Sequence, residues 1–167
     1  MSQVGAVNPR YATLNTDYAA EMSSMSDEED GPIWMVNLMK YREIADYGDS
    51  RESNISGQEA DDLYAPMAVL ADIGAEIVFA GNVETQLLGD SPKWDRIAVV
   101  KYPTRRSFLK MSSRKDFQEK HVHKEAGMQT TIVMGCTPMD TPVYSKKDWT
   151  EIACLLYTSP SPRDLST

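Results

Sequence analysis

Cysteine is scarce in this chain of 167 residues, where only Cys136 and Cys154 are present. Two cysteines do not form a disulfide framework, and neither lies in a CxxC pair, so we expect a reducing compartment. Long apolar runs are also absent, and none approaches the roughly 18 residues that a membrane helix needs. The start of the chain lacks the basic and apolar regions of a secretory signal. We therefore expect a cytoplasmic protein with no membrane segment.

Positive charge is in short supply, with 17 basic against 25 acidic residues and a net charge of −8. Nucleic acids and anionic membranes repel such a chain, so we expect neither as a partner. Residues 101–124 are the exception, with eight basic and two acidic side chains. The basic residues are Lys101, Arg105, Arg106, Lys110, Arg114, Lys115, Lys120 and Lys124. This stretch either attracts an anionic ligand or complements the acidic N-terminal segment, and we favour the second interpretation.

Motifs for several kinds of chemistry are missing: the chain has no GxGxxG, P-loop, GxSxG or EF-hand pattern. Histidine is rare too, with His121 and His123 as the only examples. A His-x-His pair can bind a metal, but residues i and i+2 of a helix point about 200° apart. The flanking residues favour a helix here. We therefore expect no metal site and no cofactor.

Apolar runs of strand length alternate with stretches of helical spacing. The predicted strands are 33–41, 76–89, 94–103 and 129–138, and the predicted helices are 57–75, 105–112 and 115–128. The order β-α-β-β-α-β is that of a ferredoxin-like fold. We therefore predict an α+β domain whose four-stranded antiparallel sheet carries its helices on one face.

Local signals predict where these elements begin or bend. Thr16 is the expected N-cap of a short helix in the acidic N-terminal segment, and Pro66 predicts a kink or late start in its helix. Ser113 and Asp116 form a capping-box pattern, and Gly81 indicates a bulge or a close backbone approach.

The strand predicted at 76–89 carries apolar residues on both faces. Ile77 and Phe79 point to one side, and Val78 and Ala80 point to the other. Helices on one face leave the second face to be covered by something else. A second copy of the sheet is the economical cover, so we expect a homodimer through the sheet face.

Several segments resemble the domain of unknown function 1330 family of the dimeric α/β-barrel superfamily. They are "MVNLMKYRE", "GAEIVFAGNVETQLLG", "WDRIAVVKYPTRRSFLKMSSRKDFQ" and "HKEAG", spread between Gly31 and Pro138. The resemblance implies a ferredoxin-like subunit paired sheet to sheet as a dimeric α/β barrel. Relatives in the superfamily include cofactor-independent monooxygenases, isomerases, haem-degrading enzymes and binding proteins, so the fold does not select an activity.

The end of the chain has a different origin in our interpretation. The stretch "CLLYTSPSPRD" back-translates codon by codon into a transposase adapter used in preparing sequencing libraries. We therefore interpret 154–167 as disordered adapter read-through on a metagenomic fragment, and not as a regulatory tail. The rest divides into an acidic extension at 1–30, the ferredoxin-like domain at 31–140 and a C-terminal extension at 141–153.

Five residues are candidates for a pocket between the sheet and the helices. His123 matches a histidine of the family's HRxA-like stretch, here HKEA, and is the candidate catalytic acid or base. Asn37, Arg42, Tyr64 and His121 are the candidate substrate-binding residues. Each has a structural alternative: a hydrogen bond to the neighbouring loop for Asn37, ion pairing for Arg42, and packing for the others.

Two functions remain open. The first is a cofactor-independent small-molecule enzyme of the isomerase or monooxygenase type, with His123 and Asn37 as polar groups. The second is a non-catalytic protein that binds a small metabolite. Both require the same pocket and an unknown small-molecule ligand.

Overall fold

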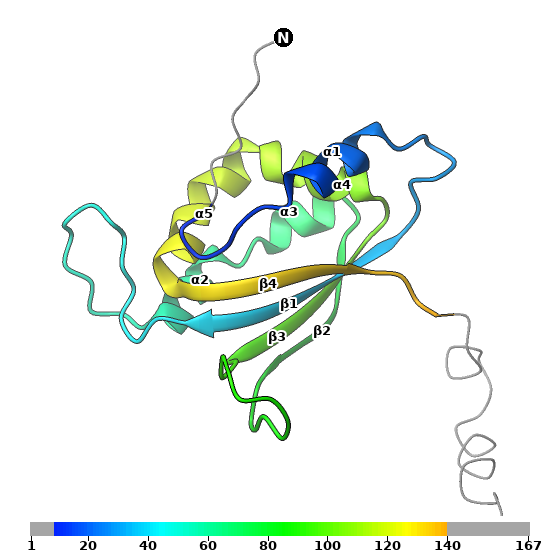
Figure 1. Cartoon of the computed structure of the whole chain (residues 1–167). Helices are drawn as coiled ribbons and strands as arrows, with labels where there is room; N and C mark the ends of the chain where they lie inside the picture. The colour runs from blue at the N-terminus through cyan, green and yellow to red at the C-terminus, as the bar shows by residue number, and fades with distance from the viewer. Residues whose placement is uncertain (1–8, 140–167) are drawn as a thin grey trace, which may run out of the picture. The chain divides into compact units, whose positions relative to one another are not determined.

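The computed structural model describes residues 9–139, with strands and helices in the predicted order (Figure 1). The first compact unit of the chain ends at Cys136. Its helices are α1 (Thr16–Ser24), α2 (Gly57–Tyr64), α3 (Met67–Asp72), α4 (Arg105–Ser113) and α5 (Lys115–Gly127). Its strands are β1 (Ile33–Tyr41), β2 (Glu76–Asn82), β3 (Arg96–Tyr102) and β4 (Met128–Cys136). The segments predicted at 141–153 and 154–167 lie outside the described residues.

The strands form one antiparallel sheet in the order β2-β3-β1-β4. Helices α1 to α5 lie on one side of this sheet (Figure 1). This arrangement is the ferredoxin-like fold, so the predicted α+β class and four-stranded sheet are confirmed.

Strand β1 separates the two faces of the sheet by simple alternation. Ile33, Met35, Met39 and Tyr41 are buried, and the first two belong to a core cluster with residues of the helices. Burying a large apolar side chain contributes roughly 1.5–3 kcal/mol. Trp34, Val36, Leu38 and Lys40 point to the opposite face, because successive side chains of a strand alternate.

The opposite face of the sheet is also apolar. Phe79, Ile132 and Met134 are 56%, 44% and 41% exposed. The register places further apolar side chains beside them, namely Trp34, Val36, Leu38, Ile97 and Val99. Among the described residues, no helix covers this open face (Figure 1). We call this set the open sheet face.

Helix starts follow side-chain chemistry. Helix α1 begins at Thr16, but its N-cap is Asn15 and not Thr16 as predicted, because the Asn15 side chain accepts the N–H of Tyr18 at 3.0 Å. Pro66 separates α2 from α3, which confirms the predicted interruption. The cause is that proline lacks the N–H that a continuous helix needs.

Three local predictions are wrong. Ser113 and Asp116 do not form a capping box, because Ser113 is the last residue of α4 and its hydroxyl donates to a carbonyl one turn earlier. Gly81 does not mark the bulge, since it pairs in register. The irregularity in β2 lies between Ile77 and Phe79. It places them opposite Val100 and Val99, which point to opposite faces, so Ile77 and Phe79 do not share a face as expected.

Residues 9–30 pack against the domain. Met22 is 3% exposed and belongs to the main core. The buried Asp30 carboxylate accepts the N–H of Arg105 at 2.6 Å and Nε of Arg106 at 2.8 Å. Burial alone raises the pKa of Asp30, but these hydrogen bonds, the strongest from Arg106, hold it below its ordinary value. The predicted complementarity between the basic stretch and the acidic segment is confirmed at this contact.

Candidate functional site

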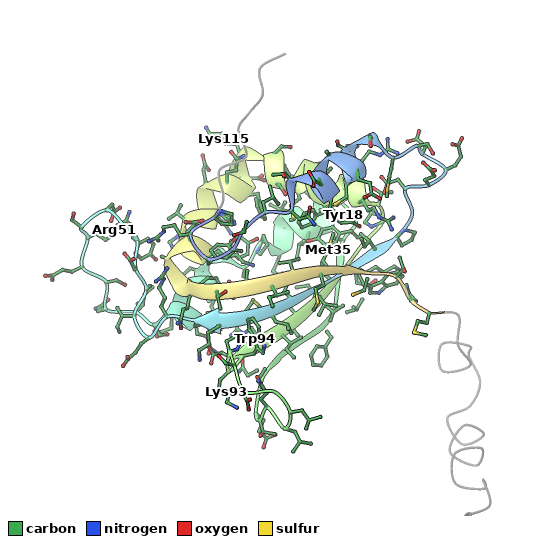
Figure 2. All side chains as sticks on the ribbon, viewed as in Figure 1. Tyr18, Met35, Arg51, Lys93, Trp94 and Lys115 are labelled. Carbon is green, nitrogen blue, oxygen red and sulfur yellow. The ribbon has the colours of Figure 1, made fainter. Side chains whose placement is uncertain are left out.

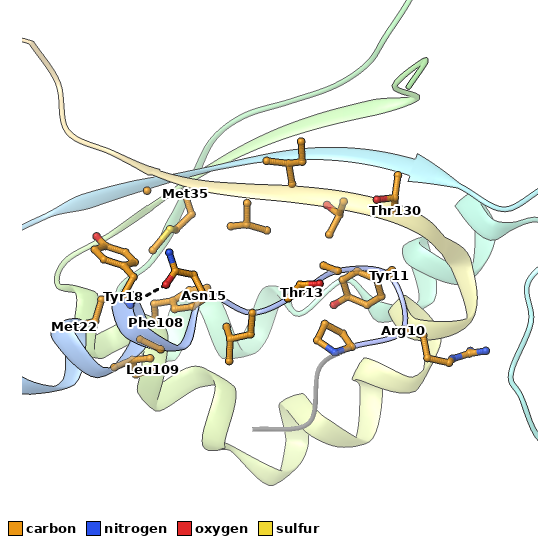
Figure 3. A pocket seen from close by; sticks show the side chains of 18 of the residues that line it. Arg10, Tyr11, Thr13, Asn15, Tyr18, Met22, Met35, Phe108, Leu109 and Thr130 are labelled. Atoms are coloured by element: carbon orange, nitrogen blue, oxygen red, sulfur yellow. Dashed lines mark hydrogen bonds between the residues drawn. The ribbon is translucent and has the colours of Figure 1, made fainter. Parts of the chain in front are cut away.

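A cavity of about 960 Å³ lies between residues 9–15, helices α1 and α4, and strand β4 (Figure 3). Tyr18 and Met22 lie at one end, and Arg10 and Tyr11 lie at the other (Figure 3). The apolar lining includes Leu14, Met35, Phe108, Leu109 and Val133, and the polar lining includes Thr13, Asn15, Gln129, Thr130 and Thr131. Small-molecule sites typically measure about 300–1,000 Å³ and have mostly apolar walls.

Tyr18 and Met35 join the cavity to the core. Both lie between the sheet and the helices (Figure 2), and Tyr18 packs against the main hydrophobic cluster that contains Met35. Gly135 of β4 lies opposite Met35 in the register. A Cβ atom there would lie 3.5 Å from the Tyr18 hydroxyl oxygen and 2.8 Å from a methyl carbon of Ile33. The glycine therefore leaves room for the Ile33 side chain of β1, whereas the distance to Tyr18 is an ordinary contact.

Tyr11 reaches from the cavity wall to a histidine of helix α5. Its hydroxyl oxygen lies 2.9 Å from Nε2 of His121, and the two ring centroids are 6.0 Å apart. Tyr11 is only 8% exposed and packs with Met39 and Met128. The contact joins residues 110 positions apart in the sequence. We call it the Tyr11–His121 pair.

Burial sets the protonation state of this pair. It lowers the pKa of His121 below the ordinary 6.5, and the positive charge of Lys124 lowers that pKa further. Burial also raises the pKa of the Tyr11 phenol, with smaller contributions from Glu125 and Asp61. Both groups are therefore neutral at pH 7. A neutral imidazole accepts a proton at one nitrogen and donates from the other, which is what general acid–base chemistry requires.

Helix α2 holds His121 from the other side. The Tyr64 ring meets Phe117 and His121 edge to face, with centroids 5.7 and 5.9 Å apart. The ammonium of Lys124 lies 5.0 Å from the Tyr64 ring centroid. Burial lowers the pKa of Lys124. The structure therefore brings together two of the predicted site residues, Tyr64 and His121.

A backbone contact explains why α2 and α5 lie this close. A Cβ atom on Gly57 or Gly127 would collide with the carbonyl oxygen of the other residue. Glycine removes that collision, and the start of α2 packs directly on the end of α5. His121 lies on the same helix as Gly127 and faces Tyr64 as a result.

His123 lies elsewhere. It occurs on the same helix, but its Nδ1 is 2.8 Å from the hydroxyl of Tyr47, in the loop after β1. The two rings pack edge to face at 5.7 Å. His121 and His123 thus have separate partners, as expected for positions i and i+2 of a helix. The catalytic role of His123 stays a prediction.

Asn37 lies on the helix-covered face of β1 but does not line the cavity. Its side-chain amide donates to the carbonyl of Met35 at 3.0 Å and, at 3.4 Å, to that of Ala98 on β3. The amide is therefore satisfied by strand backbone and not by the neighbouring loop.

Arg42 lines a second, polar cleft of about 620 Å³ at the end of β1. Its Nε is buried without a hydrogen-bond partner. Lys40 in the same cleft pairs with Asp95 at 2.9 Å. Arg42 therefore does not meet the Tyr11–His121 pair, and its substrate-binding role stays a prediction.

A separate polar cluster ties α2 to the sheet. The Tyr41 hydroxyl donates to Asp61 at 2.7 Å, and Arg96 contacts Asp61 and Asp62 at 3.4 and 2.7 Å. Burial and the charge of Asp61 raise the pKa of Tyr41. Because these groups satisfy one another, we assign them a structural role.

Tyr11 was not recognisable as a site residue from the sequence. It precedes the first predicted helix in a segment without periodicity, and no motif surrounds it. The only signal was an aromatic residue in a polar stretch. Its partner His121 is remote in sequence, so only the folded chain reveals the pair.

Within residues 9–139, no three or more His, Cys, Asp or Glu side chains are grouped to hold a metal ion. No helix in that same part of the chain has the length and apolar character needed to cross a membrane.

The fold defines a ferredoxin-like α+β protein, and solved structures resemble it. The methylated RPA0582 protein superposes with a TM-score of 0.70 and 24% identity, covering 81% of this chain and 99% of that one. The RPA0582 protein of unknown function from Rhodopseudomonas palustris superposes with a TM-score of 0.66 and 24% identity, covering 78% of this chain and 97% of that one. At this identity the likeness concerns the fold alone.

Other comparisons add no family. A dabb-family protein with a ferredoxin-like fold from Mesorhizobium loti has a TM-score of 0.41 and 8% identity, covering 65% of this chain and 98% of that one, and is too distant to support an argument. No family model and no curated protein match the chain. The resemblance to the domain of unknown function 1330 family therefore stays a prediction.

Proposed function

We propose that this protein binds a small uncharged ring compound in the cavity of Figure 3 and moves protons on it through the Tyr11–His121 pair. The reaction class is isomerisation: a C–H proton is removed and returned at another atom, so no oxidant or cofactor is consumed. The single observation that carries the proposal is the neutral Tyr11–His121 pair, in which Tyr11 lies in the cavity wall and His121 is its hydrogen-bond partner.

The lining supports the choice of an uncharged ligand. Arg10 is the only charged residue among those that line the cavity, and its guanidinium is already paired with Asp46 and Glu125. A carboxylate in this space would lose its water without gaining a free partner. A ring with hydroxyl or carbonyl groups suits the apolar walls and the neutral side chains of Thr13, Asn15 and Tyr18.

Non-catalytic binding is the alternative. His121 does not itself line the cavity, and the Tyr11 hydroxyl already has a partner. In that case the Tyr11–His121 pair holds the N-terminal segment in place, and the cavity binds a metabolite without changing it.

The test uses a thermal-shift screen of cyclic ketones, enols and phenols, each beside a matched carboxylate. Uncharged members should raise the melting temperature, since a ligand at 100 times its Kd adds about 2.7 kcal/mol. Compounds that raise the melting temperature are then incubated with the protein in deuterium oxide and analysed by mass spectrometry. Deuterium uptake at carbon supports proton transfer, whereas binding without uptake supports the alternative.

A cavity-filling variant locates the binding. Val133 is 44% exposed and lines the cavity, so Val133→Trp should abolish the thermal shift. Val122 is 40% exposed on α5 and does not line the cavity, so Val122→Trp is the matched control. Equal shifts in both variants would place the ligand elsewhere and overturn this site.

We also propose a homodimer through the open sheet face. Apolar side chains from β1, β2, β3 and β4 meet there, and Phe79 is more than half exposed. Contiguous apolar surface of this kind is characteristic of an interface. Met134→Lys should convert the dimer to a monomer in light scattering, whereas Val122→Lys, at nearly equal exposure, should not. A wild-type monomer would contradict the proposal.

A further inference from the structure

The segment 9–15 forms one wall of the cavity, yet it contains no helix or strand. Its position therefore depends on individual contacts. Tyr11 is its only residue among the buried hydrophobic side chains, and the Tyr11 carbonyl accepts the N–H of Thr131 on β4 at 3.3 Å. Something must also hold the other side of this segment against α5.

Arg10 supplies that contact. Its Nε lies 3.2 Å from Oε2 of Glu125 on α5, and its backbone N–H donates to Oε1 of the same residue at 3.2 Å. Its Nη1 lies 3.0 Å from the carboxylate of Asp46, in the loop after β1. Its Nη2 donates to the carbonyl of Glu125 at 3.2 Å and also contacts that of Asp46. One side chain thus joins the segment, the helix and the loop.

The geometry of the Arg10 contacts matters more than the strength of any single ion pair. Arg10 is 38% exposed, and its partners Asp46 and Glu125 are 56% and 25% exposed. Single ion pairs at such exposure contribute little to stability. A guanidinium that contacts carboxylates and carbonyls at once fixes direction as well as charge. Lysine has a point charge and cannot reproduce this pattern.

We propose that Arg10 is a positioning residue: it holds Tyr11 against His121 and thereby keeps water away from the imidazole. Four groups besides Tyr11 surround His121, namely Tyr64 of α2 and Phe117, Lys124 and Glu125 of α5. Tyr11 is the only one of these that depends on the segment 9–15. The consequence for turnover rests on the proposed function, but the effect on His121 exists in the ligand-free protein.

The test follows His121 by proton NMR while the pH is changed. The chain has only two histidines, so His123 gives an internal reference signal. Arg10→Ala should move the His121 titration midpoint upward, toward that of an ordinary histidine, because water reaches the ring. Arg10→Lys should restore the midpoint only in part. The Thr131 amide should exchange faster in Arg10→Ala, since its bond to Tyr11 is weakened.

A double-mutant cycle separates positioning from direct charge. Losing Arg10 also frees Glu125, whose charge raises the pKa of His121 by itself. If Arg10 acts through Tyr11, Arg10→Ala should move the His121 midpoint upward by clearly less in a Tyr11→Ala background than in the wild-type background, where only the freed charge of Glu125 remains to act. An equal upward movement in both backgrounds would mean direct electrostatics and would overturn the proposal.

Arg51→Ala is the matched control. Arg51 is an exposed arginine of the loop after β1 (Figure 2), and its ion-pair partner Asp49 lies in the same loop. Arg51→Ala should leave the His121 titration midpoint unchanged. If a substrate is found, Arg10→Ala should lower kcat by about tenfold with KM nearly unchanged. If no substrate is found but the His121 midpoint moves in Arg10→Ala, only the proposed function is rejected. If the midpoint does not move in that variant, the role of Arg10 is rejected.

Discussion

Helix α5 carries two histidines that each meet a tyrosine from a distant segment. The hydroxyl-to-nitrogen distances are 2.9 Å for Tyr11 and His121 and 2.8 Å for Tyr47 and His123. The ring centroids are also similarly spaced, at 6.0 and 5.7 Å. By residue type and hydrogen-bond length the two pairs are alike.

Their surroundings differ. Tyr11 is buried in a cluster beside the cavity, and burial lowers the pKa of His121. Tyr47 belongs to a loop, where the guanidinium of Arg51 lies 4.5 Å from its ring centroid. The comparison teaches that a tyrosine–histidine contact becomes a candidate for chemistry only where burial and a cavity coincide.

The largest expected effect is a difference in kcat between variants of the two histidines. With a substrate in hand, His121→Gln should lower kcat by about 10²–10⁴-fold, the usual contribution of a general acid or base. His123→Gln should change it by less than about threefold. Circular dichroism of both variants checks the fold. A larger loss of kcat in His123→Gln than in His121→Gln would restore His123 as the catalytic residue and contradict the distinction between the two pairs.

A smaller effect concerns stability. Tyr11→Phe removes the hydroxyl that faces a buried imidazole and should cost about 1–3 kcal/mol in urea unfolding. Tyr47→Phe removes the equivalent bond in the loop, where water can replace it, and should cost less than about 1 kcal/mol. Equal losses would mean that burial does not distinguish the pairs.

The smallest effect is the pH dependence of stability. The pKa of His121 is lower in the folded chain than the ordinary 6.5, so the unfolded chain binds the proton first as pH falls. Stability is therefore full above about pH 6.5 and is lost as pH falls through the lower folded pKa. His121→Gln should flatten the pH profile of urea midpoints in this window. A profile unchanged by that variant would contradict the lowered pKa.

Much of the fold was predictable because its signals are local. The apolar run at 33–41 became β1 with the same bounds, and Pro66 separated two helices. The predicted boundaries of the elements were wrong where tertiary contacts set them. β2 ends at Asn82, earlier than predicted, and the start of α5 has no side-chain cap.

The site was only partly predictable. Tyr64 and His121 were candidates and do meet, whereas Asn37 satisfies its amide with strand carbonyls and His123 turns to a loop. Helical periodicity separates His121 from His123 and places His121 one turn after the buried Phe117, but it does not reveal which tyrosine each histidine meets. Tyr11 carried no sequence signal that linked it to either.

The sequence by itself determined the order of strands and helices, since alternation and helical spacing are properties of neighbouring residues. It also determined that charge would join the acidic N-terminal segment to the basic stretch, as Asp30 and Arg106 do. Only the tertiary structure decided which side chains surround each histidine. Tyr11, 110 positions away in the sequence, meets His121, and Tyr64 reaches the same ring because α2 and α5 pack closely at Gly57 and Gly127. Desolvation is a property of the packed interior, and no local pattern contains it.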